Sequence, residues 1–322
     1  MHHDDDEHSH HDGGLQQDLM VDALRDPRRR LLLGSLLASG TFALIGGCGG
    51  GGDSSTSSTD SSGSTSTGST TTGTTTGSTT ATTDTSTSTT TNTNTNTNTT
   101  TSSCIADPQE TEGPYPGDGS NSANGTVANV LSSTGVVRSD IRSSFGSATG
   151  TAQGVPLTLT IKVVNSNANC AALEGYAVYI WHCTRDGEYT LYASDLLKEN
   201  YLRGVQVTDS AGQLTFETIV PGCYSGRWPH IHFEVYPSLA KATSYKNKIL
   251  TSQMALPKDI CTTVYNNATG YTASVRNLSQ ISIASDNVFG DNTTAQITQQ
   301  TPVLDGSVAK GYTGTIVIGV PV

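Results

Sequence analysis

Positive charge is scarce in this sequence. Its 322 residues include 17 Lys and Arg against 28 Asp and Glu, which gives a formal net charge of -11. Because nucleic acids are bound through cationic surfaces, this balance argues against a nucleic-acid partner. Charged residues make up only 14% of the chain, and much of its polar character comes from uncharged residues gathered in one stretch. We attribute the acidity to solubility.

Long hydrophobic runs are lacking as well. The run from Leu31 to Ile45, which follows three arginines, is too short for a stable transmembrane anchor but suits the apolar part of a signal peptide. It ends at Ile45-Gly46-Gly47-Cys48, which resembles a bacterial lipoprotein cleavage box. The arginines followed by leucines also resemble a twin-arginine export signal, with an ordinary Sec-type lipoprotein signal as the alternative. Both predict export, with a lipid on Cys48 as the only contact with the membrane.

The first 103 residues are not expected to form a folded domain. Residues 1–47 are predicted to be a leader and signal peptide, and the histidines in its first twelve positions are assigned no function. Residues 48–103 are predicted to be the lipidated cysteine and a disordered linker, because Gly, Ser, Thr, Asn and Asp cannot bury enough surface to offset the entropy of ordering. Length alone allows two domains, but composition leaves one, residues 104–322.

Five cysteines remain in the chain once Cys48 is set aside for lipid, namely Cys104, Cys170, Cys183, Cys223 and Cys261. Their odd number leaves at least one thiol unpaired or bridged to another chain. A strand over residues 174–182 would hold Cys170 and Cys183 too far apart for a disulfide. We expect a bridge between Cys223 and Cys261.

Residues 104–322 show little amphipathic helical periodicity. Apolar and polar residues alternate instead, with Gly, Pro, Asn and Asp between the alternating segments, which are Val155–Val164, Gly204–Thr208, Leu214–Ile219 and His230–Tyr236. A last strand is expected over Gly314–Val322, and short helical segments are expected around Ser238–Lys248 or Ser139–Phe145. The pattern predicts an all-β fold, an antiparallel-rich sandwich or barrel.

Histidine is rare in this domain, where only His182, His230 and His232 occur. Residues i and i+2 of a strand point to one face about 6.6 Å apart. His230 and His232 can therefore bind one ion while Ile231 and Phe233 face the other side. On spacing alone, a surface pair without function is the alternative.

The residues around the histidines resemble a known family signature. The two segments that carry it are Ile180-Trp-His-Cys-Thr-Arg-Asp-Gly-Glu-Tyr189 and Pro221-Gly-Cys-Tyr-Ser-Gly-Arg-Trp-Pro-His-Ile-His-Phe233. They are similar to the intradiol ring-cleavage dioxygenases, the family of catechol 1,2-dioxygenase and protocatechuate 3,4-dioxygenase. Further segments resemble the family in the same order, namely Thr111–Tyr115 at the mouth of the active site, Asn200–Gly204, Thr208–Gly212, Phe216–Pro221 and Thr251–Met254.

By this resemblance, Tyr189, Tyr224, His230 and His232 are the ligands of an Fe(III) ion. The residue types fit such an ion independently, because ferric iron is a hard cation that prefers anionic oxygen. Metal binding also removes the phenol proton, which would otherwise stay on near its ordinary pKa of about 10. With 12 tyrosines in the chain, position within the signature is what singles out these two.

The resemblance also implies an activity, the cleavage of catechol-type rings by O2 between the two hydroxylated carbons, which gives muconate-type diacids. Tyr224 would leave the iron when substrate binds and accept a proton, Arg227 would stabilise negative charge on the ring, and Gln253 would be a polar active-site residue. His182 is expected to be a buried, hydrogen-bonded residue and not a ligand. Trp181 and Trp228 are expected to pack.

The chain departs from its best-known relatives before residue 138. The stretch between Cys104 and Arg138 is too short for the helical dimerisation region of catechol 1,2-dioxygenases, so the domain more closely resembles the protocatechuate type or its extracytoplasmic relatives. Catechol, a substituted catechol, hydroxyquinol and a lignin-derived phenolic stay open as substrates, and an oligomer is compatible with the sequence. The alternatives to an enzyme are a non-catalytic, prealbumin-like module that binds a ligand or metal, and a structural surface lipoprotein.

Overall fold

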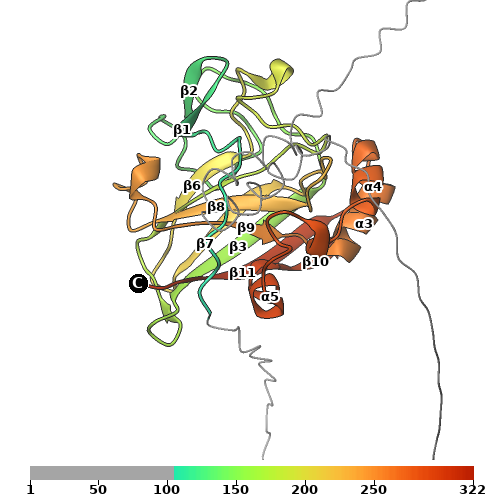
Figure 1. Ribbon diagram of the computed structural model, residues 1–322. Coiled ribbons are helices and arrows are strands. Elements are labelled where there is room, and N and C mark those ends of the chain that lie inside the picture. Colours follow the sequence, from blue (N-terminus) through green and yellow to red (C-terminus); the bar gives the residue numbers. More distant parts are fainter. Residues whose placement is uncertain (1–104) are drawn as a thin grey trace, which may run out of the picture. The chain divides into compact units, whose positions relative to one another are not determined.

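A computed structural model describes residues 105–322 (Figure 1). The predicted leader, the lipidated Cys48 and the linker lie outside the described residues, and so does Cys104. Within residues 105–322, no helix has the length and apolar content needed to cross a membrane.

Two sheets form the body of the domain (Figure 1). The larger sheet is built on β3 (Pro156–Asn165), which pairs in parallel with β11 (Gly311–Val320). The strands β7 (Gln213–Ile219) and β4 (Ala171–Ala172) pair with β3 in antiparallel fashion. The strand β10 (Val303–Ser307) extends the sheet beside β11. The second sheet is antiparallel, in the order β6 (Arg203–Val207), β5 (Ala177–Trp181), β8 (His230–Tyr236) and β9 (Leu250–Ala255). A separate hairpin consists of β1 (Asp118–Ala123) and β2 (Thr126–Asn129).

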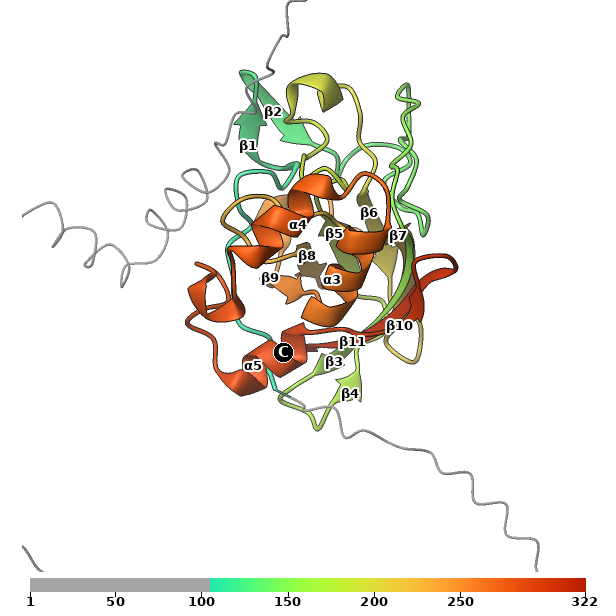
Figure 2. The same cartoon turned by 90° about the vertical axis from the view of Figure 1, so that its right-hand side faces the viewer.

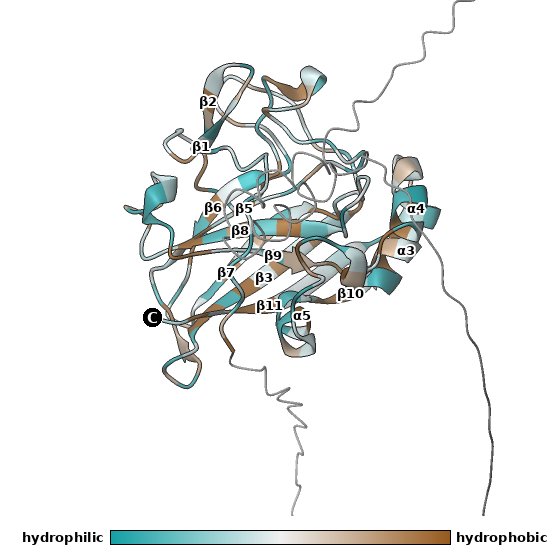
Figure 3. Ribbon diagram, in the orientation of Figure 1, coloured by the Kyte–Doolittle hydropathy of each residue, from teal (hydrophilic) through white to brown (hydrophobic). Residues whose placement is uncertain are grey.

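Period-two alternation accounts for the core between the two sheets. On β3 the residues Leu157, Leu159 and Ile161 are buried, and the threonines between them are exposed or half-buried. Figure 3 shows this mixture of hydrophobic and hydrophilic residues along the strands. Ile231 and Phe233 of β8 belong to the same core cluster. Four predicted strands match β3, β6, β7 and β8 to within one residue at each end, which confirms a mostly β fold.

The expectation of an all-β domain is wrong for the C-terminal third. Three helices occur there, α3 (Lys258–Asn267), α4 (Thr272–Ser279) and α5 (Thr294–Gln300), and α3 and α4 lie side by side at one end of the sheets (Figure 2). The helices α3 and α4 carry few apolar residues among Thr, Asn and Ser. Val264, Tyr265 and Leu278 nevertheless join the core cluster, so tertiary packing stabilises helices whose own periodicity is weak.

The two short segments in which helix was expected do not form α-helices. No helix occurs within Ser139–Phe145, and Ser238–Lys248 contains only the 3-10 turn η2 (Tyr245–Asn247). Two other 3-10 turns are η1 (Ser194–Leu196) and η3 (Ile283–Ser285).

The expected bridge between Cys223 and Cys261 is also wrong, because both are free, buried thiols, as is Cys183. The Cys223 thiol lies 3.4 Å from the carbonyl oxygen of Arg227 instead, and Cys261 lies on α3, which the sequence did not predict. Burial raises the pKa of each of these two thiols to about 12, so both stay protonated. Cys170 is disulfide-bonded, and the expectation that it does not pair with Cys183 is confirmed.

A second apolar cluster covers the outer face of the four-stranded sheet. It joins Tyr179 and Trp181 of β5 to the loop residues Leu131, Val136 and Tyr189. Because loops cover this outer face while the core covers the inner one, every residue of β8 is buried. The histidine pair on the outer face therefore lies beneath a layer of loops.

Candidate functional site

Four polar atoms converge at the outer face of β8. The Oη atom of Tyr189 lies 3.4 Å from Nε2 of His230 and 3.3 Å from Nε2 of His232. The Oη atom of Tyr224 lies 3.3 Å from Nε2 of His230, and the two Nε2 atoms are 3.0 Å apart. The structure thus brings together all four residues that the sequence singled out as ligands.

Neighbouring strands and loops hold these side chains in place. Trp181 lies opposite His232 in the β5–β8 pairing, and the two rings stack with centroids 4.8 Å apart at an angle of 7°. Tyr115, from the segment that the sequence placed at the active-site mouth, stacks on Tyr189 with centroids 4.8 Å apart. Gly187 has a φ of +92°, and a Cβ there would lie 3.1 Å from Cβ of Tyr224. Glycine therefore permits both the turn and the close approach of the second tyrosine.

The hydrogen bonds of the histidines determine which nitrogen atoms face the centre. Nδ1 of His230 lies 2.5 Å from the carbonyl oxygen of Trp228 and donates to it, so Nε2 carries a lone pair. Burial, and then the Arg227 guanidinium, lower the pKa of His230, while burial and then His230 lower that of His232. Both imidazoles are therefore neutral, which is the form that binds metal. Among the described residues, Nδ1 of His232 has no hydrogen-bond partner.

This arrangement fits a cation. Atoms that ligate one metal ion at about 2.0–2.1 Å lie roughly 3 Å or slightly more from one another, and four pairs among the atoms here lie 3.0–3.4 Å apart. Two neutral imidazoles and two phenols also offer lone pairs without bringing a buried positive charge. Residues 105–322 contain no group of three or more His, Cys, Asp or Glu that could hold a metal, so the donor set depends on the two tyrosine oxygens.

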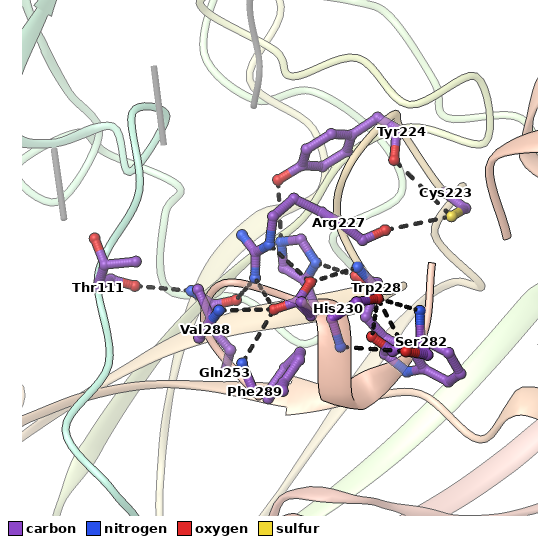
Figure 4. A network of polar contacts seen from close by, with 12 residues as sticks. Thr111, Cys223, Tyr224, Arg227, Trp228, His230, Gln253, Ser282, Val288 and Phe289 are labelled. Atoms are coloured by element: carbon purple, nitrogen blue, oxygen red, sulfur yellow. Dashed lines mark hydrogen bonds and ion pairs between the residues drawn. The ribbon is translucent and has the colours of Figure 1, made fainter. Parts of the chain in front are cut away.

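Arg227 and Gln253 lie next to each other beside this centre, as Figure 4 shows. The Arg227 side chain is completely buried, and its Nη2 donates to Oε1 of Gln253 at 2.7 Å. Gln253 is the register partner of His232 on β9, and its Nε2 donates to the carbonyl oxygen of Thr111 at 2.9 Å. The pairing of β9 with β8 thus places Gln253 at the site, although Gln253 and His232 are distant in sequence.

His182 is not part of the centre. Its Nδ1 donates to the carbonyl oxygen of Cys183 at 2.8 Å, and its Nε2 lies 2.7 Å from Oγ1 of Thr218. Burial lowers its pKa to about 4. The expectation of a buried, hydrogen-bonded histidine is confirmed, and Trp228 likewise packs in the core, where its indole N–H donates to the carbonyl oxygen of Leu256.

Residues 138–231 match the protein-family model described as "Dioxygenase". An intradiol ring-cleavage dioxygenase from Tetranychus urticae has a similar structure, with a TM-score of 0.51 and 23% identity over 68% of this chain and 96% of its own. A second dioxygenase structure gives a TM-score of 0.52 at 22% identity, with the same coverage. Over residues 138–231 the chain matches this dioxygenase family model, and its fold is similar to that of an intradiol ring-cleavage dioxygenase.

A third similar structure is the dioxygenase domain of a dioxygenase carbohydrate-binding protein fusion from Streptomyces sp. SirexAA-E. Its TM-score is 0.39 at 23% identity, and the match covers 67% of this chain and 99% of that domain. No curated protein sequence matches the chain significantly. The family match ends at residue 231. It therefore includes Tyr189, Tyr224, Arg227 and His230, and it stops before His232 and Gln253.

A fully buried arginine and a half-buried lysine anchor the mouth segment of this domain, and sequence reasoning assigned a role to neither. Arg203, fully buried, donates to the carbonyl oxygens of Tyr115 at 3.0 Å and Pro116 at 2.8 Å. The Nζ atom of Lys248 lies 2.9 Å from a carboxylate oxygen of Glu112 and 2.7 Å from one of Glu234 on β8. Arg203 lies in the segment Asn200–Gly204, whose resemblance to the family could have pointed to it. No motif in the sequence around Lys248 predicts its role.

Asp286 is a further residue beside the site that the sequence reasoning missed. Its Oδ2 accepts a hydrogen bond from Nε of Arg227 at 3.0 Å. It follows η3 in a Ser-Asp-Asn segment, a composition that by itself indicates only a turn.

Proposed function

We propose that this domain is a non-haem Fe(III) dioxygenase that cleaves catechol-type rings between the two hydroxylated carbons. O2 supplies both incorporated oxygen atoms, and the product is a muconate-type diacid. One observation carries the proposal, the convergence of two tyrosine oxygens and two imidazole nitrogens at 3.0–3.4 Å in a chain that matches this family model.

Tyr189, Tyr224, His230 and His232 would hold the ferric ion. Two phenolates and two neutral imidazoles offset two of its three positive charges and leave one for a further anionic ligand. When bound, the ion would supply a Lewis-acidic centre that favours the deprotonated catechol over the neutral one.

The two tyrosines differ in their surroundings, which supports different roles. Tyr189 is only 3% exposed and is held by the ring of Tyr115. Tyr224 is half-buried and lies on the loop before β8. We assign to Tyr189 the position of a permanent ligand, and to the Tyr224 oxygen the acceptance of a proton from the substrate hydroxyl.

Arg227 is the residue available to stabilise negative charge that develops on the ring. It is completely buried beside His230, whose pKa its charge lowers. Gln253 holds Nη2 of the guanidinium at 2.7 Å, which restricts its orientation before substrate arrives. The loop layer over the outer face would exclude water from the reacting ring and so strengthen this interaction.

The test uses iron-loaded protein, catechol or a close analogue, and ¹⁸O2. We expect a burgundy protein, from charge transfer between tyrosinate and iron, and a muconate diacid that carries label from O2. A yellow semialdehyde, which forms when the ring opens beside the hydroxyls, would contradict the proposal. A coloured protein that binds catechol without product would instead support the non-catalytic, ligand-binding alternative.

We also propose that the domain is exported and anchored through a lipid on Cys48, which the leader sequence supports. Cells fed with a labelled fatty acid should incorporate label into the full-length chain and not into a Cys48→Ala variant. Equal labelling of the two chains would contradict the anchor.

A further inference from the structure

The Asp286 carboxylate is a buried junction of five hydrogen bonds. Its Oδ2 accepts from Nε of Arg227 at 3.0 Å and from the backbone N–H of Trp228 at 2.7 Å. Its Oδ1 accepts from the backbone N–H groups of Val288 at 2.8 Å and Phe289 at 3.0 Å, and over a longer distance, 3.5 Å, from Nη2 of Arg227. The shortest bonds of Oδ1 thus hold the residue's own loop, whereas both bonds of Oδ2 hold the segment that leads into β8.

Both bonds made by Oδ2 lead to the candidate centre. Trp228, whose N–H is held, uses its carbonyl oxygen to accept the Nδ1 proton of His230 at 2.5 Å. Asp286 therefore contacts the residue that sets the tautomer of a proposed ligand. Through Nε it also holds Arg227, whose Nη2 reaches Gln253.

Contacts with the Asp286 and Gln253 side chains fix the plane of the guanidinium. A planar group held at Nε by Asp286 and at Nη2 by Gln253 cannot rotate without breaking a charge-assisted hydrogen bond. Burial by itself would raise the pKa of Asp286, but the Arg227 charge and the Trp228 N–H outweigh it and the pKa lies below the ordinary value. The pair is therefore ionic, and Arg227 would act on substrate through oriented N–H groups more than through net charge.

We propose that Asp286 is a positioning residue of the active site, which orients Arg227 and the Trp228–His230 segment for ring cleavage. The inference rests on the proposed function. Asp286 and Arg227 are 59 positions apart, and Asp286 lies beyond the family match that ends at residue 231. The segment around η3 therefore completes a site whose proposed ligands all lie on other elements.

The first test is Asp286→Asn, which keeps the shape of the side chain and an oxygen for the Val288 and Phe289 N–H groups. Its amide would face Nε of Arg227 and the N–H of Trp228, donor against donor. We expect iron content to stay near one per chain and kcat to fall by about tenfold or more, with KM changed by less than about threefold. We also expect a shifted absorption spectrum when the ferric protein binds 4-nitrocatechol, since the segment that holds His230 is displaced.

The control is Asp107→Asn, a carboxylate that is also buried but bonds to the N–H of Gly319 at 2.7 Å, away from the site. This variant should keep the kcat and the 4-nitrocatechol spectrum of the wild type. Equal losses in the two variants would mean that any buried carboxylate has this effect, and would overturn the inference.

A second test asks whether Asp286 acts through Arg227. If it does, the kcat of an Arg227→Met, Asp286→Asn double variant should be close to that of Arg227→Met alone, because the positioned group is already gone. Losses that multiply would show that Asp286 acts by another route. If Asp286→Asn does not fold, Asp286→Glu replaces it, since it keeps the charge and displaces the oxygens by one methylene.

Asp286→Glu should then bind iron normally with a lowered kcat. A wild-type kcat and spectrum in the folded, iron-loaded variant would overturn the positioning role. Failure of the proposed function is distinguishable, because the wild-type protein itself would then give no muconate diacid.

Discussion

The two faces of β8 differ in what they carry, although their residues alternate along one strand. Ile231 and Phe233 point into the core between the sheets, where both are completely buried. His230, His232 and Glu234 point to the outer face and are buried equally well, beneath loops. The inner face gains stability from apolar area, whereas on the outer face polar groups are buried in an arrangement that suits a bound ion. Equal burial thus serves stability on one face and proposed chemistry on the other.

Among the substitutions that test this difference between the two faces, we expect the largest effect from those on the outer face. Replacing Tyr189 with Phe or His232 with Ala removes a proposed permanent ligand, so iron content and turnover should fall together, by more than about 100-fold in turnover. Iron per chain, the charge-transfer absorbance and product formation measure the result. Full iron and full turnover in Tyr189→Phe would rule out the assignment.

A substitution on the inner face should lower the stability of the fold and leave iron binding and turnover unchanged. Phe233→Ala leaves a cavity in the core, and the free energy of unfolding should fall by about 3–5 kcal/mol. Protein that remains folded should bind iron and turn over as before, because the outer face is unchanged. Urea unfolding and iron analysis measure the two effects, and Phe233→Leu is the milder control. A Phe233→Ala protein that lost iron without losing stability would contradict the proposed difference between the two faces.

Tyr224→Phe sharpens the comparison within the site. The half-buried Tyr224 is the proposed proton acceptor, so this variant should keep most of its iron while kcat falls by about 10- to 100-fold. Single-turnover kinetics with catechol, alongside iron analysis, separate the two effects. Normal turnover would show that the Tyr224 oxygen has no part in proton transfer.

The smallest effect is expected at Glu234, farther along the outer face. Burial first, and then the charge of Asp118, raise its pKa to about 8, despite contacts with Lys248 and with the Tyr236 hydroxyl. The pKa of Glu234 is therefore higher in the folded protein, about 8, than the ordinary value of 4.5 that applies to the unfolded chain. The protonated carboxyl contributes its full stabilisation at pH values below about 4.5, and this stabilisation is lost as the pH rises through about 8.

Glu234→Gln should therefore unfold with nearly the wild-type free energy at pH 5, within about 0.5 kcal/mol. It should lose less stability than the wild type between pH 6 and pH 9. Urea unfolding across this range is the measurement, and parallel pH profiles for the two chains would contradict the assignment of a raised pKa to Glu234.

Local patterns account for the features that were predicted correctly. Strand alternation gave β8 its bounds and placed His230 and His232 on one face with Phe233 on the other. The family signature around Tyr189 and Tyr224 then named the residues that the structure brings within hydrogen-bonding distance of the histidines. These features depend on spacing within short segments, which the sequence displays directly.

Long-range contacts account for what was missed. The helix α3 forms because Val264 and Tyr265 pack into the core, and Cys261 on that helix could not be placed without it. Arg227 was assigned a role from its motif, but its carboxylate partner lies 59 positions away. No local period encodes such a pairing.

The sequence by itself determined the strand that carries the proposed ligands, their donor types and the family resemblance, because side-chain alternation and signature spacing are properties of neighbouring residues. Only the tertiary structure decided how the centre is enclosed and oriented. Arg203 and Lys248 anchor the mouth segment, Gln253 comes from the adjacent strand, and Asp286 reaches Arg227 from a distant turn. Burial makes each of these polar groups require a partner, and the folded chain determines which partner lies within reach.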